Sequence, residues 1–303
     1  VTILAISVRG DSNAGIDFYK ATYFGSVTIN ATNADGTAQV TGATQGIEVY
    51  SSSDGDLQVT ADNVLGNNGD GITSQTLGSG EAQFTTYGTV SGSDDGFDIR
   101  NEGTLRIYAT NADGTASVTG GRTGIRAVNL TRGFLIVTVD NADGATEDGI
   151  FARSDGAGVL INANGVVSGG RYGIDASTTN GNGVEVNATN ASGTASVTGG
   201  QTGIRAMVDA GGGRGVTITA DNVSGGIGID ARTQTGGTYV NVTTNGTVTG
   251  TTGNGINAVN NGTDGISITS TNTDGTAQVT GAQNGIFADN NNGGDVTISA
   301  NNV

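Results

Sequence analysis

An 18-residue segment that occurs four times constrains the fold of this chain more than any other feature of its sequence. The copies read TNADGTAQVTGATQGIEV, TNADGTASVTGGRTGIRA, TNASGTASVTGGQTGIRA and TNTDGTAQVTGAQNGIFA, and they begin at residues 32, 110, 189 and 271. Successive copies therefore start 78, 79 and 82 residues apart. Such regularity indicates a repeat architecture with one continuous core, so we expect residues 1–303 to form one elongated domain.

A shorter repeat lies within the long one. A Gly-Ile pair, or Gly-Phe in one case, recurs at intervals of 24 to 31 residues that average 27. The glycines of these pairs are Gly15, Gly46, Gly71, Gly96, Gly124, Gly149, Gly173, Gly203, Gly228, Gly255 and Gly285. We interpret each interval as one coil, so that three coils make one unit of about 79 residues.

Each coil contains segments whose residues alternate with a period of two, which is the period of a β-strand. The Gly is followed by an Ile, a variable residue and a small residue, as in Ile125-Arg126-Ala127. A second alternating segment, such as residues 216–220, and a short third one, such as TASV, complete the coil. Because the three segments recur in the same order and direction, each strand must pair with the coils before and after it. The sequence predicts an all-β, single-stranded parallel β-helix, or solenoid, of about eleven coils.

The composition agrees with a solenoid and argues against several functional classes. Gly, Asn and Asp accept the turn conformations that corners need, and 55 of the 303 residues are Gly. The chain has no Cys and no His, which excludes disulfides and thiol or imidazole chemistry. A net charge of −16 with scattered arginines argues against nucleic-acid binding. No apolar stretch approaches the roughly 20 residues of a membrane-spanning helix.

Asparagines follow the second strand of seven coils at equivalent positions. They are Asn33, Asn63, Asn111, Asn141, Asn190, Asn222 and Asn272. Each lies two residues after the last inward position of its strand, so the period of two predicts that its side chain points inward at a corner. A buried amide needs hydrogen-bond partners, and stacked coils supply them. We therefore predict a structural asparagine ladder, broken in every third coil by Gly88, Gly165 and Gly246.

Acidic residues form a candidate metal site. Asp94, Asp95 and Asp98, with Asp70 from the previous coil, are the densest group of carboxylates and could coordinate calcium. Asp-Gly pairs are also typical of tight turns, and neither the EF-hand spacing nor the glycine-rich calcium repeat occurs. We therefore predict no cofactor, with a calcium-dependent module as an alternative.

Paired charges on one lateral face are the candidates for catalysis. Asp98 with Asp70, or Asp175 beside Arg171, could act in a polysaccharide lyase or hydrolase. Such an enzyme would interrupt its coils with long loops and with aromatic residues that stack on sugars. This chain has no Trp and its loops stay short, so we predict that it is not an enzyme.

The GIxA strand and the VTGxxxGI corner resemble those of right-handed parallel β-helix proteins of the bacterial surface, in particular autotransporter passenger domains and adhesin-like repeat proteins. The resemblance runs across essentially the whole chain. It implies an extracellular location at a bacterial surface and a role as a structural or adhesive shaft. The partners it implies are a glycan or protein of a host or surface.

The repeat runs to both ends of the sequence without a visible cap. The chain starts in the strand VTILAISV and stops at SANNV, where other coils continue into the next corner. An uncapped end exposes an unpaired sheet edge, which invites association. We expect a segment of a longer repeat protein; the alternative is a filament subunit that associates with copies of itself, end to end or laterally.

Overall fold

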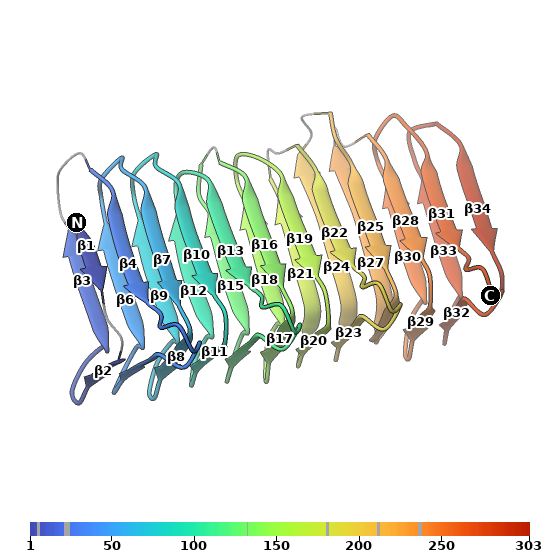
Figure 1. The fold of residues 1–303 in the computed structure, drawn as a ribbon. Coiled ribbons are helices and arrows are strands. Elements are labelled where there is room, and N and C mark those ends of the chain that lie inside the picture. Colours follow the sequence, from blue (N-terminus) through green and yellow to red (C-terminus); the bar gives the residue numbers. More distant parts are fainter. Residues whose placement is uncertain (5–6, 21–24, 132, 180–181, 211–212, 236–237) are drawn as a thin grey trace.

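The computed structural model describes residues 1–4, 7–20, 25–131, 133–179, 182–210, 213–235 and 238–303, and in it the chain is an all-β solenoid. Figure 1 shows a row of coils with the two termini at opposite ends. The strands form three parallel sheets, which we call A, B and C in their order along each coil. The described residues contain no helix. At about 4.8 Å per coil, eleven coils span roughly 50 Å. The predicted fold class is confirmed.

Each sheet takes one strand from every coil. The strands of sheet A are β1 (Thr2–Leu4), β4 (Val27–Ala31), β7 (Leu57–Ala61), β10 (Ala82–Thr86), β13 (Leu105–Ala109), β16 (Leu135–Val139), β19 (Val159–Ala163), β22 (Val184–Ala188), β25 (Val216–Ala220), β28 (Val240–Thr244), β31 (Ile266–Ser270) and β34 (Val296–Ala300). The strands of sheet B are β2 (Ser7–Gly10), β5 (Gln39–Gly42), β8 (Asn63–Gly66), β11 (Thr89–Gly92), β14 (Ser117–Gly120), β17 (Asn141–Gly144), β20 (Val166–Gly169), β23 (Ser196–Gly199), β26 (Asn222–Gly225), β29 (Thr247–Gly250) and β32 (Gln278–Gly281). The strands of sheet C are β3 (Ile16–Lys20), β6 (Ile47–Ser51), β9 (Ile72–Thr76), β12 (Phe97–Asn101), β15 (Ile125–Asn129), β18 (Ile150–Ser154), β21 (Tyr172–Thr178), β24 (Thr202–Ala210), β27 (Ile227–Thr235), β30 (Ile256–Asn260) and β33 (Ile286–Asn290).

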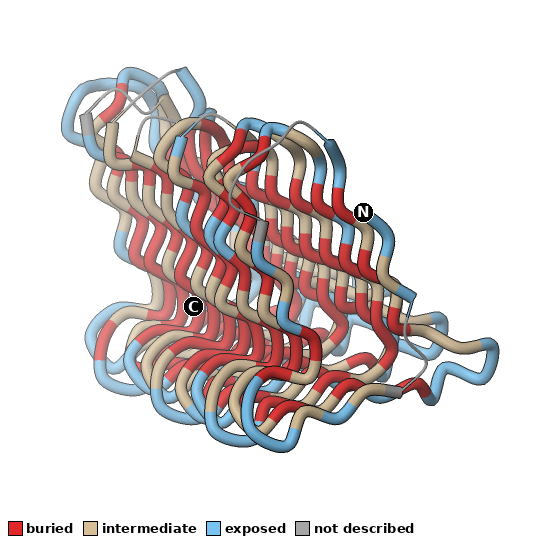
Figure 2. Tube along the Cα trace, turned by 90° about the vertical axis from the view of Figure 1, so that its left-hand side faces the viewer, coloured by how far each residue is buried: buried red, intermediate tan, exposed pale blue. Residues whose placement is uncertain are grey.

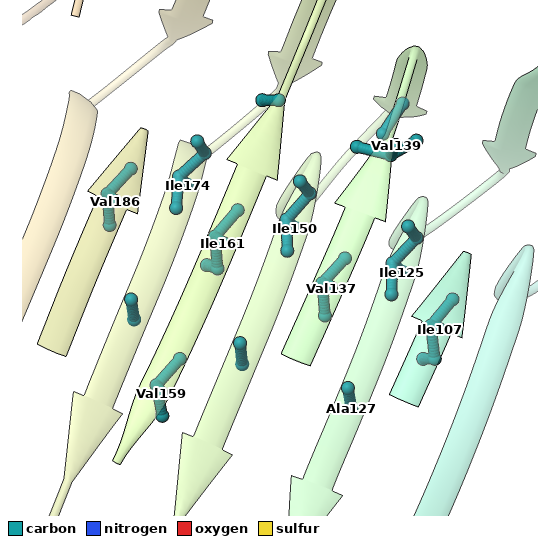
Figure 3. Close-up of a cluster of buried hydrophobic side chains, with 14 of the residues drawn as sticks. Ile107, Ile125, Ala127, Val137, Val139, Ile150, Val159, Ile161, Ile174 and Val186 are labelled. Atoms are coloured by element: carbon teal, nitrogen blue, oxygen red, sulfur yellow. The ribbon is translucent and has the colours of Figure 1, made fainter. Parts of the chain in front are cut away.

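The period of two decides which side chains fill the interior. In β16 the first, third and fifth residues are buried, and the two between them are half-buried. Parallel register stacks equivalent residues, so that Val137 lies between Ile107 and Ile161 in sheet A. Figure 3 shows this column beside that of Ile125 and Ile150 in sheet C. Each coil buries the apolar side chains of its neighbours, so the stack and not the single coil is the stable unit.

The glycine of each Gly-Ile pair is required because successive coils approach closely at this corner. A Cβ at Gly124 would lie 2.5 Å from the carbonyl oxygen of Gly149, a separation that real Cβ atoms do not show. Figure 2 shows that burial is concentrated in the strands, whereas exposed residues gather at the corners. The corners and the outward faces of the sheets are therefore the parts of the rod that solvent and partners can reach.

Candidate functional site

The seven predicted asparagines lie at the corner between sheets A and B, but their side chains do not enter the core. All seven are half-buried. The buried polar residue of this corner is an aspartate, which in three coils directly precedes the asparagine: Asp62, Asp140 and Asp221. The strand of sheet A ends before the corner, at Ala61 in β7, so the period of two does not continue through it. The predicted inward orientation is therefore wrong.

Asn63 nevertheless links three successive coils. Its Nδ2 donates to the carbonyl of Ala38 in the coil before, at 3.2 Å, and its Oδ1 accepts the N–H of Thr89 in the coil after, at 3.0 Å. Gly88 lies beneath this side chain, because a Cβ at that position would be 2.4 Å from Asn63 Oδ1. Two asparagines of later units, Asn141 and Asn222, make the equivalent bonds. The glycines that were predicted to break the ladder are thus part of the same arrangement.

The other four asparagines close exposed loops. Asn33 Oδ1 accepts the N–H of Thr37 at 2.8 Å, and Gly36 between them has a φ of 67°. Equivalent bonds are made by Asn111, Asn190 and Asn272. The repeated Asn-x-x-Gly-Thr sequence therefore forms the same loop in every third coil. The seven asparagines of the predicted ladder thus have two structural roles: three link neighbouring coils and four close loops.

A second polar column, which the sequence analysis missed, is fully buried at the corner between sheets C and A. It occupies the fifth position counted from the residue after the glycine of each Gly-Ile or Gly-Phe pair, and Val208 is an apolar member between Thr178 and Thr233. Its polar members include Ser51, Thr76, Asn101, Asn129, Ser154, Thr178, Thr233 and Asn260. Asn129 Nδ2 donates to the carbonyls of Gly103 at 2.6 Å and Gly133 at 2.7 Å. The signal was present, because the period of two that makes Ile125 and Ala127 inward also makes residue 129 inward.

The outward face of sheet C carries a column of mainly charged and polar side chains. Strand register places the following residues one above another along the rod: Asp17, Glu48, Thr73, Asp98, Arg126, Phe151, Asp175, Arg205, Asp230, Asn257 and Phe287. Opposite charges in neighbouring coils form ion pairs, as between Arg126 and Asp98 at 2.7 Å. The face thus offers a row of hydrogen-bonding groups that the phenyl rings of Phe151 and Phe287 interrupt.

Two carboxylates beside this column are buried and neutralised by arginines of the following coil. Arg122 donates from Nε and Nη2 to Asp95, at 3.2 and 2.7 Å, and Arg171 donates in the same way to Asp148, at 3.0 and 2.8 Å. Hydrogen bonding to these carboxylates raises the pKa of both guanidinium groups. Bidentate pairs of this kind hold successive coils in register.

The calcium candidates do not form a metal site in the structure. Asp95 and Asp94 pair with Arg122, and Asp98 pairs with Arg126. Among the described residues, no three acidic side chains are grouped so that they could hold a metal ion. Asp70 has an aspartate, Asp94, in the place where Asp95 and Asp148 have an arginine, and burial raises its pKa to about 6. The cluster is therefore three paired carboxylates and one that is partly buried without an arginine.

The catalytic candidates are also distributed differently from the prediction. Asp175 pairs with Arg205 at 3.1 Å, whereas Arg171 pairs with Asp148. Asp175 is buried, and burial raises its pKa to about 6 although Arg205 opposes the shift. The guanidinium groups of Arg171 and Arg205 both lie over the ring of Tyr172, at 4.9 and 5.4 Å from its centroid. An aromatic ring and two arginines thus surround this part of the face.

A hollow on this face lies over β21, β24 and β27 and has a volume of about 540 Å³. It is lined in part by Tyr172, Arg205, Met207, Ile227, Asp230 and Arg232. These residues come from three successive coils, so only the stacked solenoid creates the hollow. Its arginines and aromatic ring can bind a small polar or anionic ligand.

No protein-family model, curated protein or solved structure with which the chain was compared matches it. The described residues include no helical segment that could span a membrane.

Proposed function

We propose that this chain is a rigid shaft of an extracellular bacterial surface protein. The observation that supports the proposal best is the unbroken parallel register of all three sheets along the whole rod. A shaft must keep its length and direction, and a stack in which every coil is paired on both sides has no joint at which it can bend freely.

Three kinds of side-chain contact add to the backbone pairing between coils. Asn63, Asn141 and Asn222 each bond to the coils before and after their own. The buried column at the other corner crosses the same boundaries, for example from Asn129 to Gly103. Ion pairs such as Arg122 with Asp95 link neighbouring coils on the outer face. The polar exterior and the absence of Cys agree with a protein that works outside the cell.

The experiment that tests the shaft uses its modular construction. Deletion of residues 111–189 removes one 79-residue unit and joins Thr110 to Asn190, which restores the Asn-x-x-Gly loop. We expect a folded rod that is shorter by three coils, about 14 Å. Fluorescence energy transfer between a label at one end and a dye in the outer membrane of intact cells measures the change.

The accompanying control is antibody labelling of intact cells against the exposed loop at residues 32–37. The proposal predicts surface labelling and a distance that decreases with the deletion. Protein found only inside the cell, or a label distance that does not respond to the deletion, would contradict a shaft.

A further inference from the structure

We propose that the hollow over β21, β24 and β27 binds a carboxylate-bearing sugar, such as a uronic acid unit of an oligosaccharide. This inference goes beyond the shaft, which does not require a ligand. It rests on the shape of one corner, on two anchored arginines and on the chemistry of the hollow's rim.

The hollow arises where the corner between sheets B and C is shortest. Only Gly226 and Ile227 separate the end of β26 from the glycine of the next Gly-Ile pair, whereas the preceding and following coils use three and four residues. The longer neighbouring corners contribute Gln201 and Thr252 to the lining. A short corner between two longer ones leaves a depression, and Gly226 adds no side chain to fill it.

Two arginines in the hollow are held by buried aspartates. Arg205 donates from Nη1 to Asp175 at 3.1 Å, and Arg232 donates from Nε to Asp230 at 2.6 Å. Asp230 also accepts a hydrogen bond from Asn257 at 2.7 Å, which fixes its orientation. Each guanidinium is therefore positioned before any ligand arrives, so little side-chain entropy is lost on binding.

Both guanidinium groups keep donors available for a ligand. Within the described part of the chain, neither terminal nitrogen of Arg232 has a partner, and Arg205 uses only Nη1. Their side chains are 43% and 32% exposed. A guanidinium presents its N–H groups as a planar fork that matches the two oxygens of a carboxylate. The geometry therefore suits a carboxylate better than a hydroxyl group.

The rest of the lining suits a sugar ring. Gln201 and Thr252 offer amide and hydroxyl groups to sugar hydroxyls, and Met207 and Ile227 offer apolar surface to the C–H face of a ring. The volume of about 540 Å³ lies within the range of small-ligand sites, roughly 300 to 1,000 Å³. Because Asp175 and Asp230 balance the two arginines, recognition depends on bidentate geometry more than on net charge.

Isothermal titration calorimetry of the intact chain with a linear trigalacturonate tests the proposal. The matched probes are a neutral trisaccharide and a glutamate tripeptide. We expect trigalacturonate to bind at least tenfold more tightly than either. Equal binding of the neutral sugar, tighter binding of the acidic peptide, or no binding of trigalacturonate to the folded chain overturns the proposal.

Variants locate the binding in the hollow. We expect Arg232→Gln to weaken trigalacturonate binding at least tenfold, and Arg232→Lys, which keeps the charge but loses the planar fork, to weaken it several-fold. Arg153→Gln is the matched control, because Arg153 is also held through Nε by an aspartate, Asp155 at 2.9 Å, and is 47% exposed outside the hollow. Circular dichroism confirms that each variant is folded. Undiminished trigalacturonate binding by Arg232→Gln, or an equal loss of affinity in the Arg153→Gln control, would contradict binding in the hollow.

Discussion

The side-chain oxygen of Asn63 occupies the space in which a Cβ of residue 88 would lie, at 2.4 Å from an ideal Cβ built on Gly88. The same oxygen accepts the N–H of Thr89 at 3.0 Å. Equivalent pairs recur one and two units later, as Asn141 with Gly165 and Asn222 with Gly246. The 79-residue period of the sequence therefore corresponds to a repeated set of hydrogen bonds between coils. In each unit, an asparagine side chain packs against a glycine of the following coil.

We expect Gly88→Ala to destabilise the rod by about 2 kcal/mol, because the added methyl group displaces the Asn63 side chain from its bonds to two neighbouring coils. Urea denaturation followed by circular dichroism measures the loss. Gly69→Ala is the control, since a Cβ there meets the flexible end of Gln45 at 3.3 Å and the backbone of Thr44 at an ordinary contact distance of 3.5 Å. In the double variant Asn63→Ala/Gly88→Ala the two losses should be clearly less than additive. Additive losses would mean that the two residues do not interact.

Arg122→Gln should destabilise the protein by about 3 kcal/mol, because the Asp95 carboxylate is 0% exposed and loses its bidentate partner. Adding Asp95→Asn should restore much of the stability, since the buried charge is then gone. The matching surface change is Arg9→Gln. The side chains of Arg9 and of its partner Asp11 are both 81% exposed, so the effect on stability should be close to zero. Equal effects of the two arginine variants would contradict the importance of burial.

The pKa of Asp70 predicts a pH dependence of stability. Burial raises this pKa from an ordinary value of 3.8 to about 6, so the folded chain binds a proton more readily than the unfolded chain between these values. Stability from this group is fully present below pH 3.8 and is lost as the pH rises through about 6.

Asp70→Asn should therefore equal the parent chain near pH 4 and exceed it near pH 7, by on the order of 1 kcal/mol after screening by solvent. Thermal unfolding at both values measures this. Burial also raises the pKa of Asp175 to about 6. The stability of the Asp70→Asn variant should therefore still decrease with rising pH, but less steeply than that of the parent chain. An Asn variant that is less stable at pH 7 would show that the charged form of Asp70 is required.

Thr86→Val should stabilise the chain by about 1 kcal/mol. The Thr86 hydroxyl is buried and has no hydrogen-bond partner in the described part of the chain, while the paired positions in adjacent coils hold Ala61 and Ala109. Removing an unsatisfied buried hydroxyl at constant volume is favourable. Thr244→Val is the opposite case, because the Thr244 hydroxyl bonds to Ser270 at 2.9 Å, and it should destabilise. Effects of the same sign in both variants would contradict this reasoning.

The solenoid was predictable because its cause is local and repeated. Alternation such as Ile125-Arg126-Ala127 predicts which side chains point inward. Recurrence at a period near 27 residues predicts that each strand pairs with the equivalent strands of the neighbouring coils. The same rule, continued by one step, predicts the buried Asn129. Applied to Asn33 it fails, because β4 ends at Ala31 and the chain turns before the asparagine is reached.

The candidate site depends on contacts between coils, which are harder to read from one sequence. Asp175 has Arg171 close by in the chain, yet it pairs with Arg205, which strand register places directly opposite it in the next coil. The position of the hollow was visible as the short spacing from Gly225 to Gly228. Which side chains line it follows only from the alignment of three coils, whose strands stay in register while their corners differ in length.

The most direct test of the continuous, rigid rod is one distance along its axis. Since the chain has no Cys, spin labels on Thr28→Cys and Thr297→Cys are the only ones introduced. The two residues belong to the same outward column of sheet A, ten strand-to-strand steps apart. Double electron–electron resonance should give one narrow distribution centred near 48 Å, at about 4.8 Å per step. A broad or divided distribution, or a much shorter distance, would contradict a rigid shaft.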